Sequence, residues 1–104
     1  GRIPVERVAM AALAAMPPEK ESELRSADGP ATAVRFHNQT PRQVQLFWLD
    51  DHGKRRPYGT LAPGERRDQQ TFATHVWLAA DPDGRGLAVF VAGPEPGLAD
   101  IKEP

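Results

Sequence analysis

Short stretches of alternating apolar and polar residues run through the middle of the chain and predict β-strands. They occur at about residues 32–37, 43–49, 54–58, 66–72, 75–80 and 87–92. The segments between them, such as NQTP, DDHG, LAPGE and DPDGRG, are rich in the Gly, Pro, Asn and Asp residues that form turns. Short strands at this spacing predict a mainly β fold, either an antiparallel β-sandwich or a small barrel, and we favour the sandwich.

The N-terminal segment has a different period. Apolar residues within residues 4–16 follow the spacing of one helix face, and Pro4 suits the first position of a helix. Pro17 and Pro18 would end that helix. We therefore expect one N-terminal α-helix before the strands, packed either on its own domain or on a neighbouring domain or partner.

Composition shifts divide the chain further. Residues 19–30 are charged and then turn-forming, which is typical of a linker. Residues 1–30 are thus predicted to form a helix and linker, and residues 31–104 the β domain. The tail from Gly93 to Pro104 holds three prolines, so we expect it to lie on the surface or to be disordered. The start at Gly1 without a methionine favours a fragment of a longer polypeptide.

Charge and residue usage exclude several functions. The 104 residues suffice for one domain, and 13 basic against 14 acidic residues leave a net charge of −1. No strong field results, so neither nucleic acid nor membrane is an expected partner. The chain has no cysteine, which excludes disulfides and thiol chemistry. No serine or lysine lies in a nucleophile motif, and Asp50-Asp51-His52 fits a turn; we predict neither an enzyme nor a bound cofactor or metal.

The aromatic residues are concentrated in one region. Both tryptophans (Trp48, Trp77) and the only tyrosine (Tyr58) lie within residues 47–78, which also contain Thr71 and His75. Aromatic rings with a few polar groups can wall a pocket for a small, mildly polar ring. The same tryptophans also fit core aromatics, and a lone histidine is often structural.

Alternation in residues 75–80 bears on this choice. His75 and Trp77 share one face of the predicted strand, and Val76 and Leu78 share the other. Because Val76 and Leu78 are natural core residues, we expect His75 and Trp77 on the more open face. That placement favours a pocket.

A series of motifs at fixed spacing resembles the β-domain family of the von Hippel-Lindau tumour suppressor. The resemblance runs without a gap from about Val34 to about Trp77. It rests on FxNxxPRxV (Phe36, Asn38, Pro41, Arg42, Val44), Trp48-Leu49, Gly53, Pro57-Tyr58, Thr60-Leu61, Pro63-Gly64, His75 and Trp77-Leu78. Each motif alone is weak, but together they are specific.

The resemblance implies a β-sandwich that binds an extended peptide containing 4-hydroxyproline. Thr71, which stands where the family has Ser, and His75 would bond the proline hydroxyl, while the rings grip the pyrrolidine. Gln70 stands where a His is usual and Phe72 where a Tyr is usual, which bears on contacts with the surrounding peptide. The implied ligand-binding residues are Trp48, Tyr58, Gln70, Thr71, Phe72, His75 and Trp77.

The resemblance also sets limits. In the family protein a helical domain follows the sandwich and docks a ubiquitin-ligase adaptor, whereas this chain ends soon after the strands. We therefore expect no such adaptor as a partner, and the composition favours a bacterial source. Two hypotheses remain: a module that recognises hydroxyproline, and a structural or interaction domain that lacks this specificity.

Overall fold

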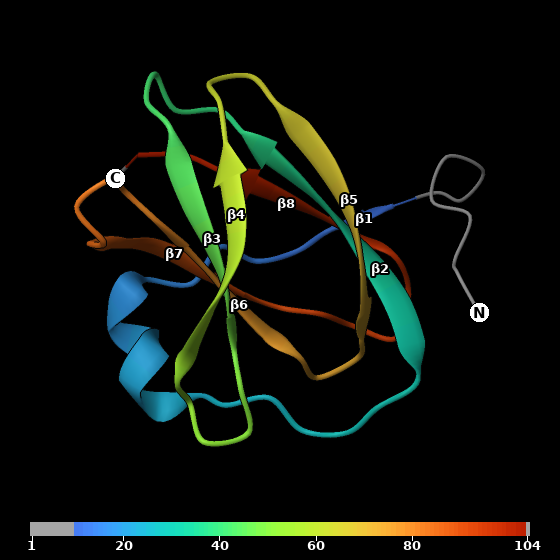
Figure 1. Cartoon of the computed structure of the whole chain (residues 1–104). Helices are drawn as coiled ribbons and strands as arrows, with labels where there is room; N and C mark the ends of the chain where they lie inside the picture. Colours follow the sequence, from blue (N-terminus) through green and yellow to red (C-terminus); the bar gives the residue numbers. More distant parts are fainter. Residues whose placement is uncertain (1–9, 104) are drawn as a thin grey trace.

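Two four-stranded β-sheets make up most of the molecule (Figure 1). The computed structural model describes residues 10–103. One sheet has the strand order β1-β8-β2-β5 and the other the order β4-β3-β6-β7. The strands are β1 (Ala11–Ala12), β2 (Ala31–Asn38), β3 (Val44–Leu49), β4 (Arg55–Leu61), β5 (Arg66–Phe72), β6 (Val76–Ala80), β7 (Gly86–Val91) and β8 (Gly97–Ile101), with a 3-10 helix η2 (Pro18–Glu23). The predicted mainly β class is confirmed.

The turns form where the sequence predicts them, and two of them share one design. Asp50 Oδ1 accepts hydrogen bonds from the backbone N–H groups of His52 and Lys54, each at 2.9 Å. Asp81 Oδ1 accepts the equivalent bonds from Asp83 and Arg85, also at 2.9 Å. Each aspartate thereby closes the turn that follows it. These bonds hold the pKa of both carboxyl groups below the usual value.

The predicted N-terminal helix is wrong where it can be compared. Residues 4–9 lie outside the described residues, and residues 10–16 are extended. Ala11–Ala12 pairs in parallel with Gly97 and Leu98 of β8, and Met16 exchanges two backbone hydrogen bonds with Val89 of β7. Both strands would otherwise present unpaired backbone groups at an edge. Pairing with them outweighs the helical propensity of the alanines, and the only helix among residues 10–103 is η2.

The predicted surface tail is also wrong, because it contains a central strand. β8 lies between β1 and β2 and runs parallel to both, so this sheet is not purely antiparallel. Ala99 and Ile101 of this strand are fully buried. Pro94 and Pro96 precede the strand rather than interrupt it, which leaves its backbone N–H groups free to pair.

The main hydrophobic core combines residues of both sheets. Phe36 of β2, Trp77 of β6, Phe90 of β7 and Ile101 of β8 belong to one buried cluster. The Phe36 ring contacts two other aromatic rings: its centroid lies 5.6 Å from that of Trp77 and 6.3 Å from that of Phe90. The expected open face for Trp77 is therefore wrong: this indole is 2% exposed.

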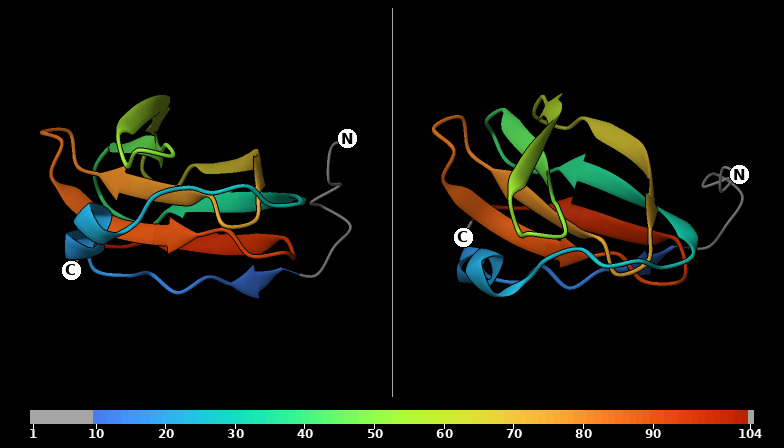
Figure 2. Two further views of the ribbon diagram at one scale, coloured as in Figure 1. Left: turned by 90° about the horizontal axis from the view of Figure 1, so that it is seen from below. Right: turned by 60° about the horizontal axis from the view of Figure 1, so that its bottom comes forward.

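A second, smaller cluster explains that error. Leu49, Val76, Leu78 and Val89 pack together, and Met16 and Leu24 of the N-terminal segment pack against them. The N-terminal segment runs along the strands that carry this cluster, as Figure 2 shows. Strand β6 is thus buried on both faces, so alternation alone could not tell which face was open.

Candidate functional site

The structure brings the family-implied residues together around one small pocket. Its volume is about 120 Å³, and it is lined by Trp48, Tyr58, Gln70, Thr71, Phe72, His75 and Trp77. They come from four strands, β3, β4, β5 and β6, and from the turn between the last two. Their placement together fits the sequence prediction, and their role as ligand contacts stays a prediction.

Strand register accounts for much of this convergence. Trp48 of β3 pairs directly with Trp77 of β6. β4 and β5 are edge strands of different sheets, and Arg67 of β5 connects them by donating to the backbone oxygens of Tyr58 and Thr60. The bond to Thr60 is 2.9 Å long. Arg67 therefore holds the strand that carries Tyr58 against the strand that carries Thr71.

The floor of the pocket is a part of the core. Trp77 Nε1 donates a 3.1 Å hydrogen bond to Thr71 Oγ1, and both residues are buried. The Tyr58 ring meets the Trp77 ring edge-on, with centroids 5.0 Å apart and planes at 80°. The indole bond fixes the Thr71 oxygen, whose O–H group can still donate and whose second lone pair can still accept.

His75 stands between two aromatic rings. Its ring centroid lies 5.3 Å from that of Trp48 and 5.3 Å from that of Phe72. Burial lowers the pKa of His75 below 6.5, and the negative charge of Asp28 opposes this shift. At neutral pH the imidazole is therefore neutral and offers one N–H donor and one nitrogen acceptor.

A tight turn sets the position of His75. The His75 backbone N–H donates to Phe72 O at 3.0 Å, and Thr74 has a positive φ of 76°. The Thr74 hydroxyl donates to Ala27 O at 2.8 Å, which attaches the turn to the preceding loop. A left-handed conformation is costly for threonine, and this contact helps to hold it.

The rim of the pocket is open and apolar. Tyr58 is 44% exposed and Phe72 is 47% exposed, and they are the exposed large hydrophobic residues of the described chain. Trp48 Nε1, in contrast, is buried without a hydrogen-bond partner among residues 10–103. A buried N–H group without an acceptor is unfavourable and calls for an explanation, such as a ligand that supplies an acceptor.

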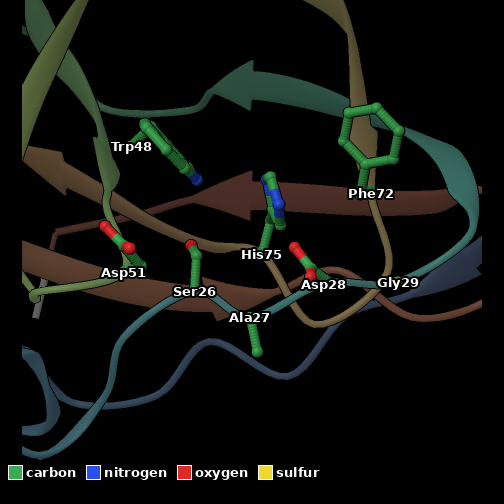
Figure 3. Close-up of a pocket in the computed structure, with 8 residues that line it drawn as sticks. All are labelled: Ser26, Ala27, Asp28, Gly29, Trp48, Asp51, Phe72 and His75. Atoms are coloured by element: carbon green, nitrogen blue, oxygen red, sulfur yellow. The ribbon is translucent and has the colours of Figure 1, made fainter.

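A wider pocket of about 530 Å³ adjoins the small one (Figure 3). Trp48, Phe72 and His75 line both. The wider pocket is completed by Ser26, Ala27, Asp28, Gly29 and Asp51. Sequence reasoning assigned residues 26–29 to a linker and Asp51 to a turn, and it missed their place beside the site.

Ser26 and Gly29 explain how this loop is held. Ser26 Oγ accepts a 2.8 Å hydrogen bond from the Val76 N–H and donates to Leu49 O, so it connects β6 to β3. At Gly29 a Cβ atom would lie 2.2 Å from Ala73 O, which only glycine avoids. The Ser-Ala-Asp-Gly segment is thus held in place beside the site by contacts with other strands, although its composition is that of an ordinary turn.

Other kinds of site are not formed by the described residues. No group of three or more His, Asp or Glu side chains within residues 10–103 is arranged to hold a metal ion. Over the same residues the structure contains no helix that is long and apolar enough to cross a membrane.

Comparison with known proteins agrees with this geometry. The family model described as the VHL beta domain matches residues 24–92, which include every residue that lines the two pockets. Protein Vhl of Drosophila melanogaster is 40% identical over 48 residues, which are 46% of this chain and 27% of that protein. The chain thus matches about a quarter of this relative, and an insect relative gives no support to the expected bacterial source. The chain belongs to the VHL beta domain family.

Proposed function

We propose that this domain is a binding module that recognises 4-hydroxyproline in an extended peptide or protein segment. The observation that carries the proposal is the small pocket, in which a hydroxyl group and a neutral imidazole lie among four aromatic side chains. Drug-sized ligands occupy pockets of about 300–1,000 Å³. A cavity of about 120 Å³ suits a single small ring instead.

Hydrogen bonding gives the pocket a reason to prefer hydroxyproline over proline. Thr71 is 5% exposed and His75 is partly buried, so both give up water when a ring enters. The 4-hydroxyl would accept from one group and donate to the other, whereas proline would leave the O–H donor of Thr71 and a ring nitrogen of His75 unpaired, at about 1–3 kcal/mol each. The total of about 2–6 kcal/mol corresponds to roughly a thirtyfold to ten-thousandfold preference.

The rings contribute affinity without this preference. Trp48, Tyr58 and Trp77 contact the apolar part of a pyrrolidine, which proline and hydroxyproline share. Gln70 and Phe72 line the same pocket with side chains that differ from those usual in the family. We therefore propose that the peptide around the ring is recognised differently here.

The second candidate is a structural or protein-interaction domain without hydroxyproline specificity. One observation favours it: Thr71 and Trp77 already satisfy one another through the 3.1 Å hydrogen bond, and Trp77 is a core residue. Under either candidate we propose a non-catalytic domain with its two sheets as the layers of a sandwich. In neither case do we expect nucleic acid or a membrane as the partner, because the net charge of −1 gives no strong field.

Isothermal titration with matched proline and 4-hydroxyproline peptides separates the candidates. Wild-type protein should bind the hydroxyproline peptide at least thirtyfold more tightly, by the estimate of about 1–3 kcal/mol per unpaired group. His75→Ala should remove most of this preference, whereas His52→Ala, an exposed histidine in the β3–β4 turn, is the matched control. Tyr58→Ala should weaken both peptides alike. Equal affinity of the wild type for both peptides would leave the second candidate standing.

A further inference from the structure

We infer that the wider pocket receives a basic side chain, lysine or arginine, from the same peptide, within two residues of the hydroxyproline. That such a peptide binds, with its hydroxyproline ring in the small pocket, rests on the proposed function. The charge preference rests on residues outside the small pocket, Asp28 and Asp51.

The two pockets are close enough to hold neighbouring residues of one extended chain. They share three lining residues, Trp48, Phe72 and His75. An extended peptide advances about 3.3 Å per residue, and successive side chains point to opposite sides. A ring seated beside His75 therefore places a nearby side chain over the wider pocket. At about 530 Å³ this pocket is large enough for a long, flexible side chain.

The charges of the wider pocket are negative. Asp28 and Asp51 line it, and none of the described lining residues is a lysine or an arginine. Figure 3 shows the two carboxylates on either side of Ser26, below Trp48, His75 and Phe72. Asp28 acts on the site already, since its charge raises the pKa of His75 against the effect of burial.

Arg56 and His52 do not cancel this field. Arg56 donates to the carboxylate of Asp50 at 2.8 Å, so its charge is already paired. His52 lies 3.8 Å from Asp51, but both side chains are more than three-quarters exposed, and His52 carries charge only when protonated. Neither Arg56 nor His52 neutralises the two pocket aspartates, so both carboxylates can attract a cation from outside.

The aromatic walls suit the rest of a basic side chain. Trp48 forms one wall and the half-exposed Phe72 another. Lysine and arginine lay their apolar stems along such surfaces and keep the charged head toward water or carboxylates. Aromatic faces also attract the cation itself. An acidic side chain would meet the same carboxylates with repulsion.

A factorial set of peptides tests the inference with the whole 104-residue chain. The residue at the ring position is either proline or hydroxyproline. A second residue, one or two positions before or after it, is lysine, norleucine or glutamate, and each of these placements is made as a separate peptide. Fluorescence polarisation at low salt should show lysine over glutamate by about tenfold in one of these placements. An exposed ion pair gives about 0.2–1 kcal/mol to lysine, and repulsion costs glutamate a similar amount, which together correspond to roughly twofold to thirtyfold. The ratio should shrink at 0.5 M salt, where screening is strong.

Variants assign the effect to the two carboxylates. Asp28→Asn with Asp51→Asn should make lysine and glutamate peptides equal while the preference for hydroxyproline remains. The control, Asp83→Asn with Glu95→Gln, changes the net charge equally at exposed residues that line neither pocket, and it should keep the lysine preference.

The preference for hydroxyproline and the preference for lysine can each be refuted independently of the other. Hydroxyproline preference with equal binding of lysine and glutamate peptides overturns this inference and keeps the proposed function. A lysine preference that depends on Asp28 and Asp51, without a hydroxyproline preference, keeps this inference and overturns the proposed function. Binding of none of the peptides rejects both. A lysine preference that survives the paired asparagine substitutions also overturns the inference, because the charge would then act elsewhere.

Discussion

Replacement of Thr71 by valine should destabilise the domain although the two side chains have nearly the same shape. The substitution removes only the hydroxyl that accepts the 3.1 Å hydrogen bond from Trp77 Nε1. Trp77 is 2% exposed, so its indole N–H would lose its partner without gaining water. Leaving a buried donor unpaired costs about 1–3 kcal/mol.

The chain contains a matched control for this substitution. Thr32 of β2 pairs directly opposite Thr71 of β5 and is 1% exposed, but its hydroxyl has no hydrogen-bond partner among the described residues. Thr32→Val removes a buried polar group that is already unpaired. It should therefore be neutral or stabilise the fold, by at most about 1–3 kcal/mol. The same chemical change at facing positions is thus expected to have opposite signs.

Urea unfolding followed by circular dichroism measures both changes. For a domain of this size each kcal/mol lowers Tm by about 4–8 °C, so Thr71→Val should also be evident in thermal scans. Thr71→Ser keeps the acceptor and should lose less stability than Thr71→Val. Equal losses for the valine variants at positions 71 and 32 would refute the role assigned to the indole bond.

Two further predictions concern His75 and Arg67. Burial lowers the pKa of His75, so as pH falls this histidine is protonated in the unfolded chain before it is protonated in the folded chain. The stability that depends on neutral His75 is therefore complete above about pH 6.5 and is lost as pH falls through the lowered pKa. Urea midpoints of wild type and His75→Gln between pH 5 and 8 test this, and parallel curves would contradict it. Arg67→Met should weaken proline and hydroxyproline peptides equally, by about threefold to tenfold, since hydrogen bonds of charged groups give about 1.5–3 kcal/mol and these are partly exposed. Arg66→Met is the control in the same titration, and an unchanged affinity of Arg67→Met would show that Tyr58 is held without it.

The strands and turns were predictable because their signals are local. The alternation of β2, with Val34 and Phe36 buried and Arg35 and His37 more exposed, can be read from the residues themselves. Gly53, Gly64 and Gly84 each have a positive φ in a predicted turn. Periodicity of two and glycine chemistry need no knowledge of the rest of the chain.

The errors arose where distant contacts decide. The alanine-rich segment at residues 10–16 has helical periodicity, yet backbone pairing with β8 and β7 makes it extended. β8 has few residues and follows Pro94 and Pro96, so its local sequence resembles a tail. Its partners β1 and β2 lie far away in the sequence, and only the folded chain brings them to it.

The site divides in the same way. The small pocket was accessible through the family resemblance, which fixes Trp48, Thr71 and His75 together. No local signal marked residues 26–29 as the wall of the wider pocket, because a serine, an aspartate and a glycine also make an ordinary turn. What distinguishes them is contact across the fold: Ser26 joins β3 to β6, and Gly29 allows a close approach to Ala73.

Trp77 belongs to the core and to the pocket at once, and this double role has a consequence for recognition. The Thr71 hydroxyl and the Tyr58 ring are oriented by an indole that folding has already fixed, so a ligand need not order them at binding. The rim residues Phe72, Asp28 and Asp51 are exposed and contribute little to the core. Substitution of Thr71 at the floor should therefore change stability and hydroxyproline preference together, whereas substitutions at the rim can change the preferred peptide while the fold stays intact.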